Sequence, residues 1–270
     1  MHRIPKDCHV GKNVTINVRG KLHIGKCGYI GDNCTIDCQD FIVGDYLYMA
    51  NGVEIGRGGS SNPDAIVTIG HHVGIFENTV INPNSPVTIG NDVGIGCDVM
   101  IWTHGAWLDV TQGFPADFGP VTIGNNVWLP ARSVVLPNTT IGDNCVIGIG
   151  STITKDIPSG SMAAGTPCKV LRENIYPKEL DTFELEALIN PILDYWYDTL
   201  VPHKGIDTVT FLKYNISMEM IVLSQGNNIT KFDPRSKTMT GFVNDVAEDL
   251  RDFLRRRGIK IYTGKPFKSI

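Results

Sequence analysis

The sequence is dominated by a six-residue repeat, in which an aliphatic residue returns at every sixth position in blocks. The longest block keeps one register without a break from Ile123 to Ile153. A period of six matches neither the 3.6-residue helix nor the two-residue alternation of a strand. The repeated positions are Val10, Ile16, Ile24, Ile30, Ile36, Val43, Met49, Ile55, Ile69, Ile75, Ile81, Ile89, Ile95, Ile101, Ile123, Leu129, Val135, Ile141, Ile147 and Ile153.

This period is typical of a coil with three flat sides, each a short strand that ends in a sharp turn. The aliphatic residue points inward and stacks on its equivalent in the next coil. Glycine often follows it, and Asn or Asp often stands three positions later; both tolerate the left-handed backbone of such turns. These Asn and Asp positions are 13, 33, 92, 98, 126, 138 and 144. We expect a mainly β protein with about eight coils, roughly 40 Å long. A glycine-rich sandwich would not keep this register.

Composition narrows the classes of partner and compartment. The net charge is -4 and the pI about 6.0, which gives no electrostatic reason to expect nucleic acid. No stretch approaches the 18 apolar residues of a membrane span, and the polar start lacks the apolar segment of a signal peptide. The seven cysteines are scattered without a CxxC pair. We therefore expect a cytoplasmic protein whose reduced cysteines fill the core and bind no metal.

Residues 120–173, PVTIGNNVWLPARSVVLPNTTIGDNCVIGIGSTITKDIPSGSMAAGTPCKVLRE, resemble the C-terminal half of galactoside and maltose O-acetyltransferases. These enzymes belong to the hexapeptide-repeat acyltransferase superfamily. The resemblance is strong over residues 65–173 and continues as the repeat alone back to about residue 8. It implies a left-handed parallel β-helix, which is an exception to the right-handed crossover rule. It also implies a homotrimer with active sites between subunits, and acetyl-CoA as co-substrate.

The resemblance implies that His104, in the sequence Ile-Trp-Thr-His, is the general base. Ile101 and Ile123 lie 22 residues apart where one repeat needs six, so residues 105–120 are expected as an extruded loop. This aromatic and glycine-rich loop suits the cleft of a neighbouring subunit. Histidine, with an ordinary pKa near 6.5, suits the removal of a hydroxyl proton during direct transfer. The other histidines, expected to be surface or capping residues, are His2, His9, His23, His71, His72 and His203.

Coenzyme A contacts follow from the resemblance residue by residue. Trp128 and Ala131 flank the pantetheine arm, and Ile149 lies further along it. Thr154 and Lys155 meet the nucleotide end. Lys169 and Arg172 face the phosphates, with which cations make charge-assisted contacts. Lys155 and Arg172 could equally be surface charges, and Trp128 could be a subunit-packing residue. Pro130 and Ile149 depart from the family pattern and could shift the arm. The expected contacts are Trp128, Ala131, Ile149, Thr154, Lys155, Lys169 and Arg172.

Acceptor recognition is expected from the coil before His104, whose amide and carboxylate side chains suit sugar hydroxyls. Asparagine is also the ordinary turn residue of this fold, so a structural role stays open. The candidate residues are Glu77, Asn78, Asn82, Asn84 and Trp102.

The repeat ends near residue 173, which predicts a β-helix domain over 1–173 and a small α+β domain over 174–270. Residues 178–200 are expected as helix, interrupted at Asn190-Pro191. Strands are expected over 208–213, 216–224 and 228–232, with turns at 225–227 and 233–235. A last amphipathic helix follows, with one face formed by Phe242, Val246, Leu250 and Leu254 and its end at Gly258.

Three functions compete. The first is acetyl transfer to a hydroxyl of a sugar or glycan, as in polysaccharide biosynthesis. The second is N-acetylation of a nucleotide-linked amino sugar, and the third is a scaffold without catalysis. Zinc-dependent carbonic anhydrases use a similar prism, but they need an HxxxxH pair that this sequence lacks.

Overall fold

A computed structural model describes residues 4–215 and 217–267. The chain divides into two compact units, of which the first ends at Lys178 and the second begins at Glu179. None of the helices in the described part is long and apolar enough to cross a membrane.

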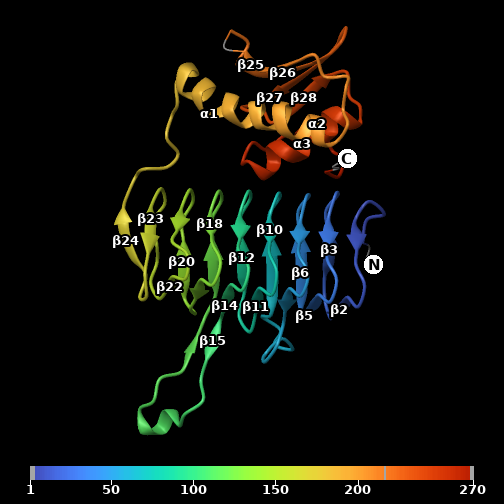
Figure 1. Cartoon of the computed structure of the whole chain (residues 1–270). Helices are drawn as coiled ribbons and strands as arrows, with labels where there is room; N and C mark the ends of the chain where they lie inside the picture. Colours follow the sequence, from blue (N-terminus) through green and yellow to red (C-terminus); the bar gives the residue numbers. More distant parts are fainter. Residues whose placement is uncertain (1–3, 216, 268–270) are drawn as a thin grey trace. The chain divides into compact units, whose positions relative to one another are not determined.

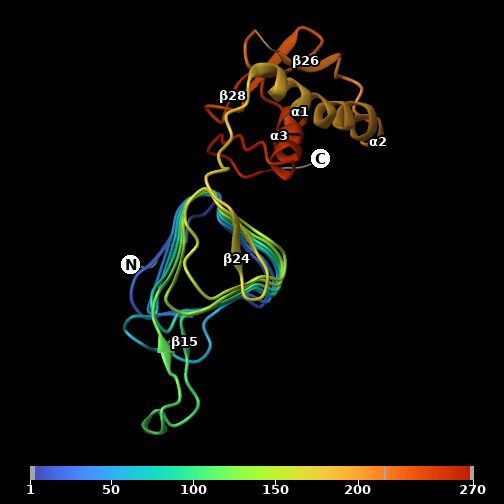
Figure 2. The same cartoon turned by 90° about the vertical axis from the view of Figure 1, so that its left-hand side faces the viewer.

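The first unit is the predicted left-handed parallel β-helix, a prism with three sheets as its faces (Figures 1 and 2). Face 1 consists of β1 (His9–Val10), β4 (Tyr29–Ile30), β7 (Tyr48–Met49), β10 (Gly74–Ile75), β13 (Gly94–Ile95), β18 (Trp128–Leu129), β21 (Val146–Ile147), β23 (Met162–Ala164) and β24 (Lys169–Arg172). Face 2 consists of β2 (Thr15–Val18), β5 (Thr35–Cys38), β8 (Glu54–Ile55), β11 (Val80–Asn82), β14 (Met100–Trp102), β19 (Val134–Val135) and β22 (Thr152–Ile153). Face 3 consists of β3 (Leu22–Ile24), β6 (Asp40–Val43), β9 (Ile66–Ile69), β12 (Val87–Ile89), β17 (Val121–Ile123) and β20 (Thr139–Ile141).

The interior is built from ladders of the repeated aliphatic residues. On face 2, Ile55 pairs with Ile81 and Ile81 with Ile101, so each side chain stacks on its equivalent one coil away. All of the repeated positions from Ile24 to Ile153 are buried. Val10, in the first coil, is exposed because no described coil lies beyond it. The six-residue period therefore predicts the core correctly except at this end.

The turns between faces confirm the prediction for the Asn and Asp residues and correct the prediction for the glycines. All seven expected Asn and Asp residues adopt a positive φ, between 53° and 58°, and His72 does so at 60°. The glycines that follow the aliphatic residues mostly have no positive φ. They are needed for close approach instead: a Cβ on Gly25 would stand 2.4 Å from the Gly44 carbonyl carbon of the next coil. Adjacent coils thus meet backbone to backbone at these positions.

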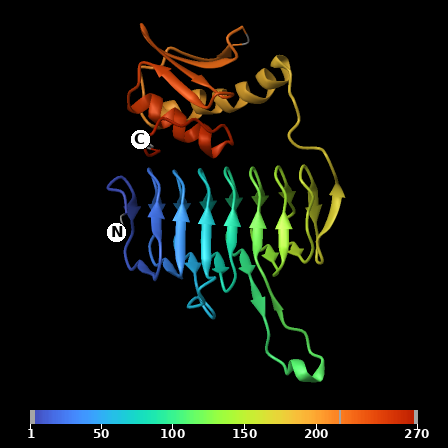
Figure 3. The ribbon, with the colours of Figure 1, turned by 180° about the vertical axis from the view of Figure 1, so that it is seen from behind.

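Two segments leave the prism where the chain passes from face 2 to face 3, which we call the 2–3 edge (Figure 3). Residues 57–64, the excursion, connect β8 to β9. Residues 104–118 form a hairpin in which β15 (His104–Gly105) pairs antiparallel with β16 (Asp117–Phe118) around a 3₁₀ turn at Val110–Gln112. Figures 1 and 3 show both segments on the same side of the prism.

The second unit is the predicted small α+β fold. Two helices, α1 (Thr182–Tyr195) and α3 (Asp245–Arg256), share one core with an antiparallel sheet. Between the helices lie a π-helical turn at Trp196–Leu200, α2 (Val201–His203) and the sheet, whose strands are β25 (Phe211–Asn215), β26 (Met220–Gln225), β27 (Asn228–Asp233) and β28 (Thr238–Gly241).

Two expectations for this unit are wrong, and one strand was not expected. Helix α1 continues through Pro191, because Ile189 and Leu193 on either side are buried in the core and their packing offsets the lost hydrogen bond. A fourth strand, β28, pairs with β27 after the Asp233 turn, although its Thr- and Gly-containing sequence gives little strand pattern. Phe242 lies before α3 and is exposed, because Asn244 caps the helix and sets its start. Ile216, where the second strand was expected to begin, lies outside the described residues.

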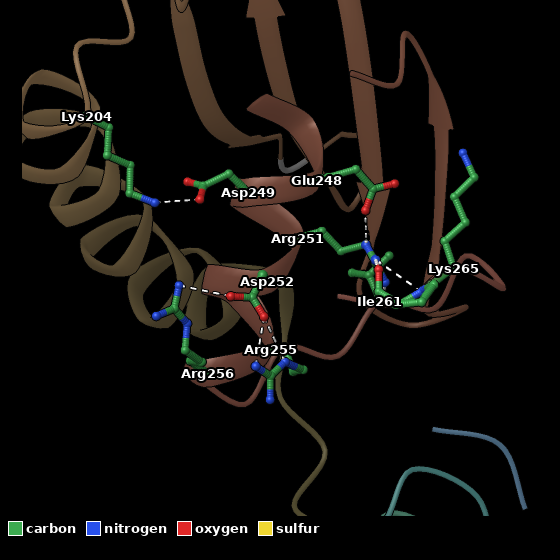
Figure 4. A network of polar contacts seen from close by, with 10 residues as sticks. Lys204, Glu248, Asp249, Arg251, Asp252, Arg255, Arg256, Ile261 and Lys265 are labelled. Atoms are coloured by element: carbon green, nitrogen blue, oxygen red, sulfur yellow. Dashed lines mark hydrogen bonds and ion pairs between the residues drawn. The ribbon is translucent and has the colours of Figure 1, made fainter. Parts of the chain in front are cut away.

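A buried charge network joins α3 to the rest of this unit (Figure 4). The carboxylate of Asp249 is fully buried and accepts hydrogen bonds from the Lys204 ammonium and the Trp196 indole. Arg251 pairs with Glu248 and also donates to the carbonyl oxygens of Ile261 and Pro266. Two further arginines of the helix end, Arg255 and Arg256, pair with Asp252 and add to this network.

Candidate active site

The candidate site lies on the 2–3 edge, between the excursion and the hairpin. The excursion follows β8, the turn 83–86 follows β11, and the hairpin follows β14. Because these three strands are consecutive in face 2, the turn 83–86 lies between the excursion and the hairpin. Both segments contact this turn. Thr103 at the base of the hairpin donates to the Asn82 carbonyl (2.8 Å) and accepts from the Ser85 N–H (3.0 Å). Gly59 of the excursion packs against the Asn84 side chain.

His104 is the first residue of the hairpin and is half-buried. Its ring stacks on Phe118 with centroids 5.9 Å apart and meets Trp102 edge-on at 6.2 Å. A Cβ built on Gly58 would stand 4.0 Å from His104 Nε2 and near no other side chain. The opposite ring nitrogen, Nδ1, is buried and has no hydrogen-bond partner among the described residues. Nε2 is therefore the nitrogen that faces the space between the two segments.

Three of the expected acceptor residues lie beside His104, and two do not. Asn82 and Trp102 are register partners on neighbouring strands, and Asn84 follows in the turn. Asn82 is only 1% exposed, yet its Oδ1 has no partner among the described residues. Glu77 and Asn78 precede β11 on the opposite side of face 2, where the chain passes from face 1 to face 2 (the 1–2 edge). There the Asn78 amide donates to Asp98 at 3.4 Å.

The expected coenzyme A residues also divide between locations. Thr154 and Lys155 follow β22 on the 2–3 edge, on the C-terminal side of His104. Ala131 and Ile149 lie on the 1–2 edge in successive coils, where the Gly150 N–H donates to the Ala131 carbonyl (3.0 Å). Ile149 is 74% exposed.

The remaining three coenzyme A candidates belong to face 1. Trp128 lies on β18 and is exposed, whereas Arg172 and Lys169 lie on β24, the antiparallel strand that ends the sheet. One prism therefore presents the candidate residues on both edges of face 2 and on face 1, not along one line.

The excursion is the part of the site that sequence reasoning missed. Arg19 and Asp37 hydrogen-bond to Ser60 of the excursion from coils far from His104 in sequence, and no motif marks them. The one available indication was the interruption of the repeat between Ile55 and Ile69, which are 14 residues apart where one repeat needs six. An insertion at one edge of a regular solenoid is a common way to build a binding surface.

Six thiols of the prism lack the character of nucleophiles. Burial raises the pKa of the Cys38 thiol to about 12 and that of Cys8 to about 11. Burial also raises the pKa values of Cys27, Cys34, Cys145 and Cys168. These thiols stay protonated near neutral pH, as expected of core residues. Among the described residues, no group of three or more His, Cys, Asp and Glu side chains is arranged to hold a metal ion.

Three of the remaining histidines have structural surroundings, whereas His23 and His203 are exposed. His71 accepts from the Asp45 N–H (3.0 Å) through Nδ1, and His9 stacks on Tyr29. His72 occupies a left-handed turn, as its position in the repeat predicts. His2 lies outside the described residues.

Comparison with known proteins identifies the family. A family model described as "Bacterial transferase hexapeptide (six repeats)" matches residues 120–155. Over 54 residues, the chain is 61% identical to the galactoside O-acetyltransferase of Escherichia coli strain K12. The chain belongs to the hexapeptide-repeat acyltransferase superfamily. The resemblance seen in the sequence is thereby confirmed at the level of the superfamily.

The curated hexapeptide-repeat relatives match over a limited stretch. The match to galactoside O-acetyltransferase covers 20% of this chain and 27% of that enzyme. Related Staphylococcus aureus proteins are 52% identical over 63 residues, which is 32% of their length. The chain thus spans about a third or less of the length of these relatives.

Solved structures of acyltransferases are similar to part of this chain. A galactoside acetyltransferase in complex with coenzyme A is 36% identical, with 51% of this chain and 70% of that chain covered and a TM-score of 0.44. An N-acyltransferase from Bacillus cereus in complex with dTDP and coenzyme A is 18% identical, with 64% and 92% covered and a TM-score of 0.48. The repeat, rather than an overall superposition, identifies the family.

Proposed function

We propose that this protein is an acetyl-CoA-dependent O-acetyltransferase that transfers acetyl to a hydroxyl of a sugar or glycan. The observation that carries this proposal is the position of His104. It stands at the base of the hairpin with Nε2 directed toward the space beside Gly58, in a chain that is 61% identical over 54 residues to a galactoside O-acetyltransferase.

In this proposal, His104 removes the proton of the acceptor hydroxyl as its oxygen attacks the thioester carbonyl carbon. The carbon–sulfur bond then breaks, the acetyl group stays on the acceptor oxygen, and the coenzyme A thiolate takes up a proton. General-base assistance of this kind is worth about 10²–10⁴ in rate. The half-buried ring, packed between Trp102 and Phe118, is restricted in orientation, which favours proton transfer at one nitrogen.

The division of the candidate residues supports a homotrimer with sites between subunits. Thr154 and Lys155 share the 2–3 edge with His104, whereas Ala131, Ile149, Glu77 and Asn78 occupy the 1–2 edge. A co-substrate held by both groups in one prism would have to cross face 2. If the 2–3 edge of one copy faces the 1–2 edge of the next, the two groups line one groove. The exposed hairpin, with Trp107 96% exposed, then contacts the neighbouring copy.

Thermal unfolding with and without acetyl-CoA tests co-substrate binding, because a ligand at about 100 times its Kd stabilises the native state by roughly 2.7 kcal/mol. Release of the free thiol in the presence of sugar acceptors tests transfer. We expect a clear upward shift in Tm, and His104→Ala should lower turnover about 10²–10⁴-fold while the shift persists. The absence of both a shift and transfer in the wild-type chain would favour a scaffold instead.

A further inference from the structure

The excursion is held in place by a clamp of three residues from this chain. Arg19 donates to the Ser60 carbonyl (3.1 Å) and, through its other terminal nitrogen, to Asp37 Oδ1 (2.7 Å). The Ser60 hydroxyl, which is buried, donates to Asp37 Oδ2 (3.1 Å). Successive backbone bonds from Ser60 to Arg57 and from Asn62 to Gly59 tighten the segment. The excursion is thus an ordered wall rather than a loose loop.

The excursion approaches His104 at Gly58, a residue without a side chain. Gly58 leaves the space at His104 Nε2 open, since its hypothetical Cβ would be 4.0 Å away. Gly59, with a φ of +88°, packs so closely on Asn84 that a Cβ there would overlap its amide. The position of Gly58 relative to the base is therefore set both by the clamp and by the turn beneath it.

The arginines of the excursion and of its clamp offer no unpaired cation to this space. Both arginines on this side are paired: Arg19 with Asp37, and Arg57 with Glu54 at 2.8 Å. The rings of Trp102 and Phe118 lie against His104, and Asn82, the register partner of Trp102, has a buried Oδ1 that lacks a partner among the described residues. Ring faces and an amide oxygen suit the C–H and O–H groups of a sugar. The phosphates of a nucleotide-linked sugar favour unpaired cations.

We propose that the excursion selects the acceptor and admits an uncharged sugar, whose reacting hydroxyl lies between Gly58 and His104 Nε2. Asp37 is then a positioning residue, because it acts through Ser60 and never touches the acceptor. This inference rests on the proposed acetyl transfer and adds the acceptor class and the residues that define it.

Substitution of Gly58 tests the proposal directly. The Cβ of Gly58→Val would lie 4.0 Å from His104 Nε2 and within 4 Å of no other side chain, so the Tm should stay within about 2 °C of wild type. With methyl β-galactoside or maltose as acceptor, the acceptor KM should rise about tenfold or more, while the KM for acetyl-CoA changes less than about twofold. A smaller rise is expected for Gly58→Ala. An unchanged acceptor KM in Gly58→Val, or a wild-type preference for a uridine-diphosphate-linked amino sugar, overturns the proposal.

A chemical readout makes the test independent of acceptor choice. Diethyl pyrocarbonate modifies neutral imidazole nitrogens, and mass spectrometry of the peptides reports each histidine separately. Modification of His104 should slow about fivefold or more in Gly58→Val, because access to Nε2 is reduced. The exposed His203 serves as the internal control and should react equally in both proteins. Equal modification of His104 in both proteins would contradict the proposed geometry.

The positioning role of Asp37 needs a matched control. Asp37→Asn weakens the clamp, whereas Asp32→Asn changes a comparable capping carboxylate that accepts from the Lys12 N–H and is remote from the excursion. We expect Asp37→Asn to raise the acceptor KM severalfold with little change in the KM for acetyl-CoA, and Asp32→Asn to leave both unchanged.

The result for the wild-type chain separates two failures. If wild type transfers acetyl and Gly58→Val and Asp37→Asn behave like it, only this inference fails. If wild type neither binds acetyl-CoA nor transfers acetyl, the proposed function itself fails.

Discussion

The indole of Trp128 lies over Gly94 of the neighbouring coil. The two residues are register partners on β18 and β13, and a Cβ on Gly94 would stand 2.6 Å from Trp128 Cε3. Glycine at this position therefore determines where the exposed ring lies on face 1. Because Trp128 is a candidate contact of the pantetheine arm, this pair connects the regular prism to the proposed co-substrate site.

Gly94→Ala should displace the indole and lower the free energy of unfolding by about 1–3 kcal/mol through overpacking. Under the proposed function, it should also weaken acetyl-CoA binding, measured by calorimetry. A double-mutant cycle with Trp128→Ala supplies the control, since removal of the ring relieves the clash. If Gly94→Ala lowers the free energy of unfolding equally in wild type and in Trp128→Ala, a clash with the indole is not the cause of the loss.

Charge reversal at Lys155 should weaken acetyl-CoA binding. Lys155 is exposed on the 2–3 edge, the edge that also carries His104. A tenfold weaker Kd would remove roughly 1.4 kcal/mol of ligand stabilisation, read as a smaller acetyl-CoA-dependent rise in Tm for Lys155→Glu. Lys12→Glu changes the charge equally at an exposed site among the first coils and should leave the shift intact. Equal shifts in the two variants would remove Lys155 from the proposed site.

The buried Asp249 should be among the most sensitive positions of the second unit. Asp249→Ala leaves the largely buried Lys204 ammonium without its carboxylate, and such a loss costs about 3–5 kcal/mol. We expect faster hydrogen exchange throughout α3, measured by mass spectrometry. As a control, Lys213→Ala removes the exposed pair with Glu186, which is worth about 0.5 kcal/mol or less. Comparable effects of both variants would argue against a stabilising role for the buried network.

Stability should fall as the pH rises above about 9, because the unfolded chain releases thiol protons that the folded prism retains. In the folded prism the pKa of Cys38 is raised to about 12. Its contribution to the free energy of unfolding is therefore complete below the pKa of a free thiol, and it is lost as the pH rises from there toward 12. Each such thiol adds a slope of about 1.4 kcal/mol per pH unit in this window. Urea unfolding of Cys38→Ala should give a shallower slope than wild type above pH 9. Between pH 6 and 8 the two curves should run parallel, and a common slope above pH 9 would contradict the assignment.

The candidate site shows where sequence reasoning stops. His104, Asn82, Asn84 and Trp102 were singled out from the sequence, and the structure brings them together on one edge. Glu77 and Asn78 were grouped with them because they precede β11 closely in sequence. In a three-sided coil, however, a few residues are enough to cross a whole face, so these two lie on the other edge.

The sequence by itself determined the prism, its core and its left-handed turns, because each repeat specifies its own inward residue and corner, and stacking repeats the same contacts. Only the tertiary structure decided that Gly58 meets His104, that Arg19 and Asp37 hold Ser60, and that Pro191 lies within a continuous helix. These relationships join residues from different coils, or depend on packing around a proline. No local period encodes them, since their energy comes from surfaces that exist only after the chain has folded.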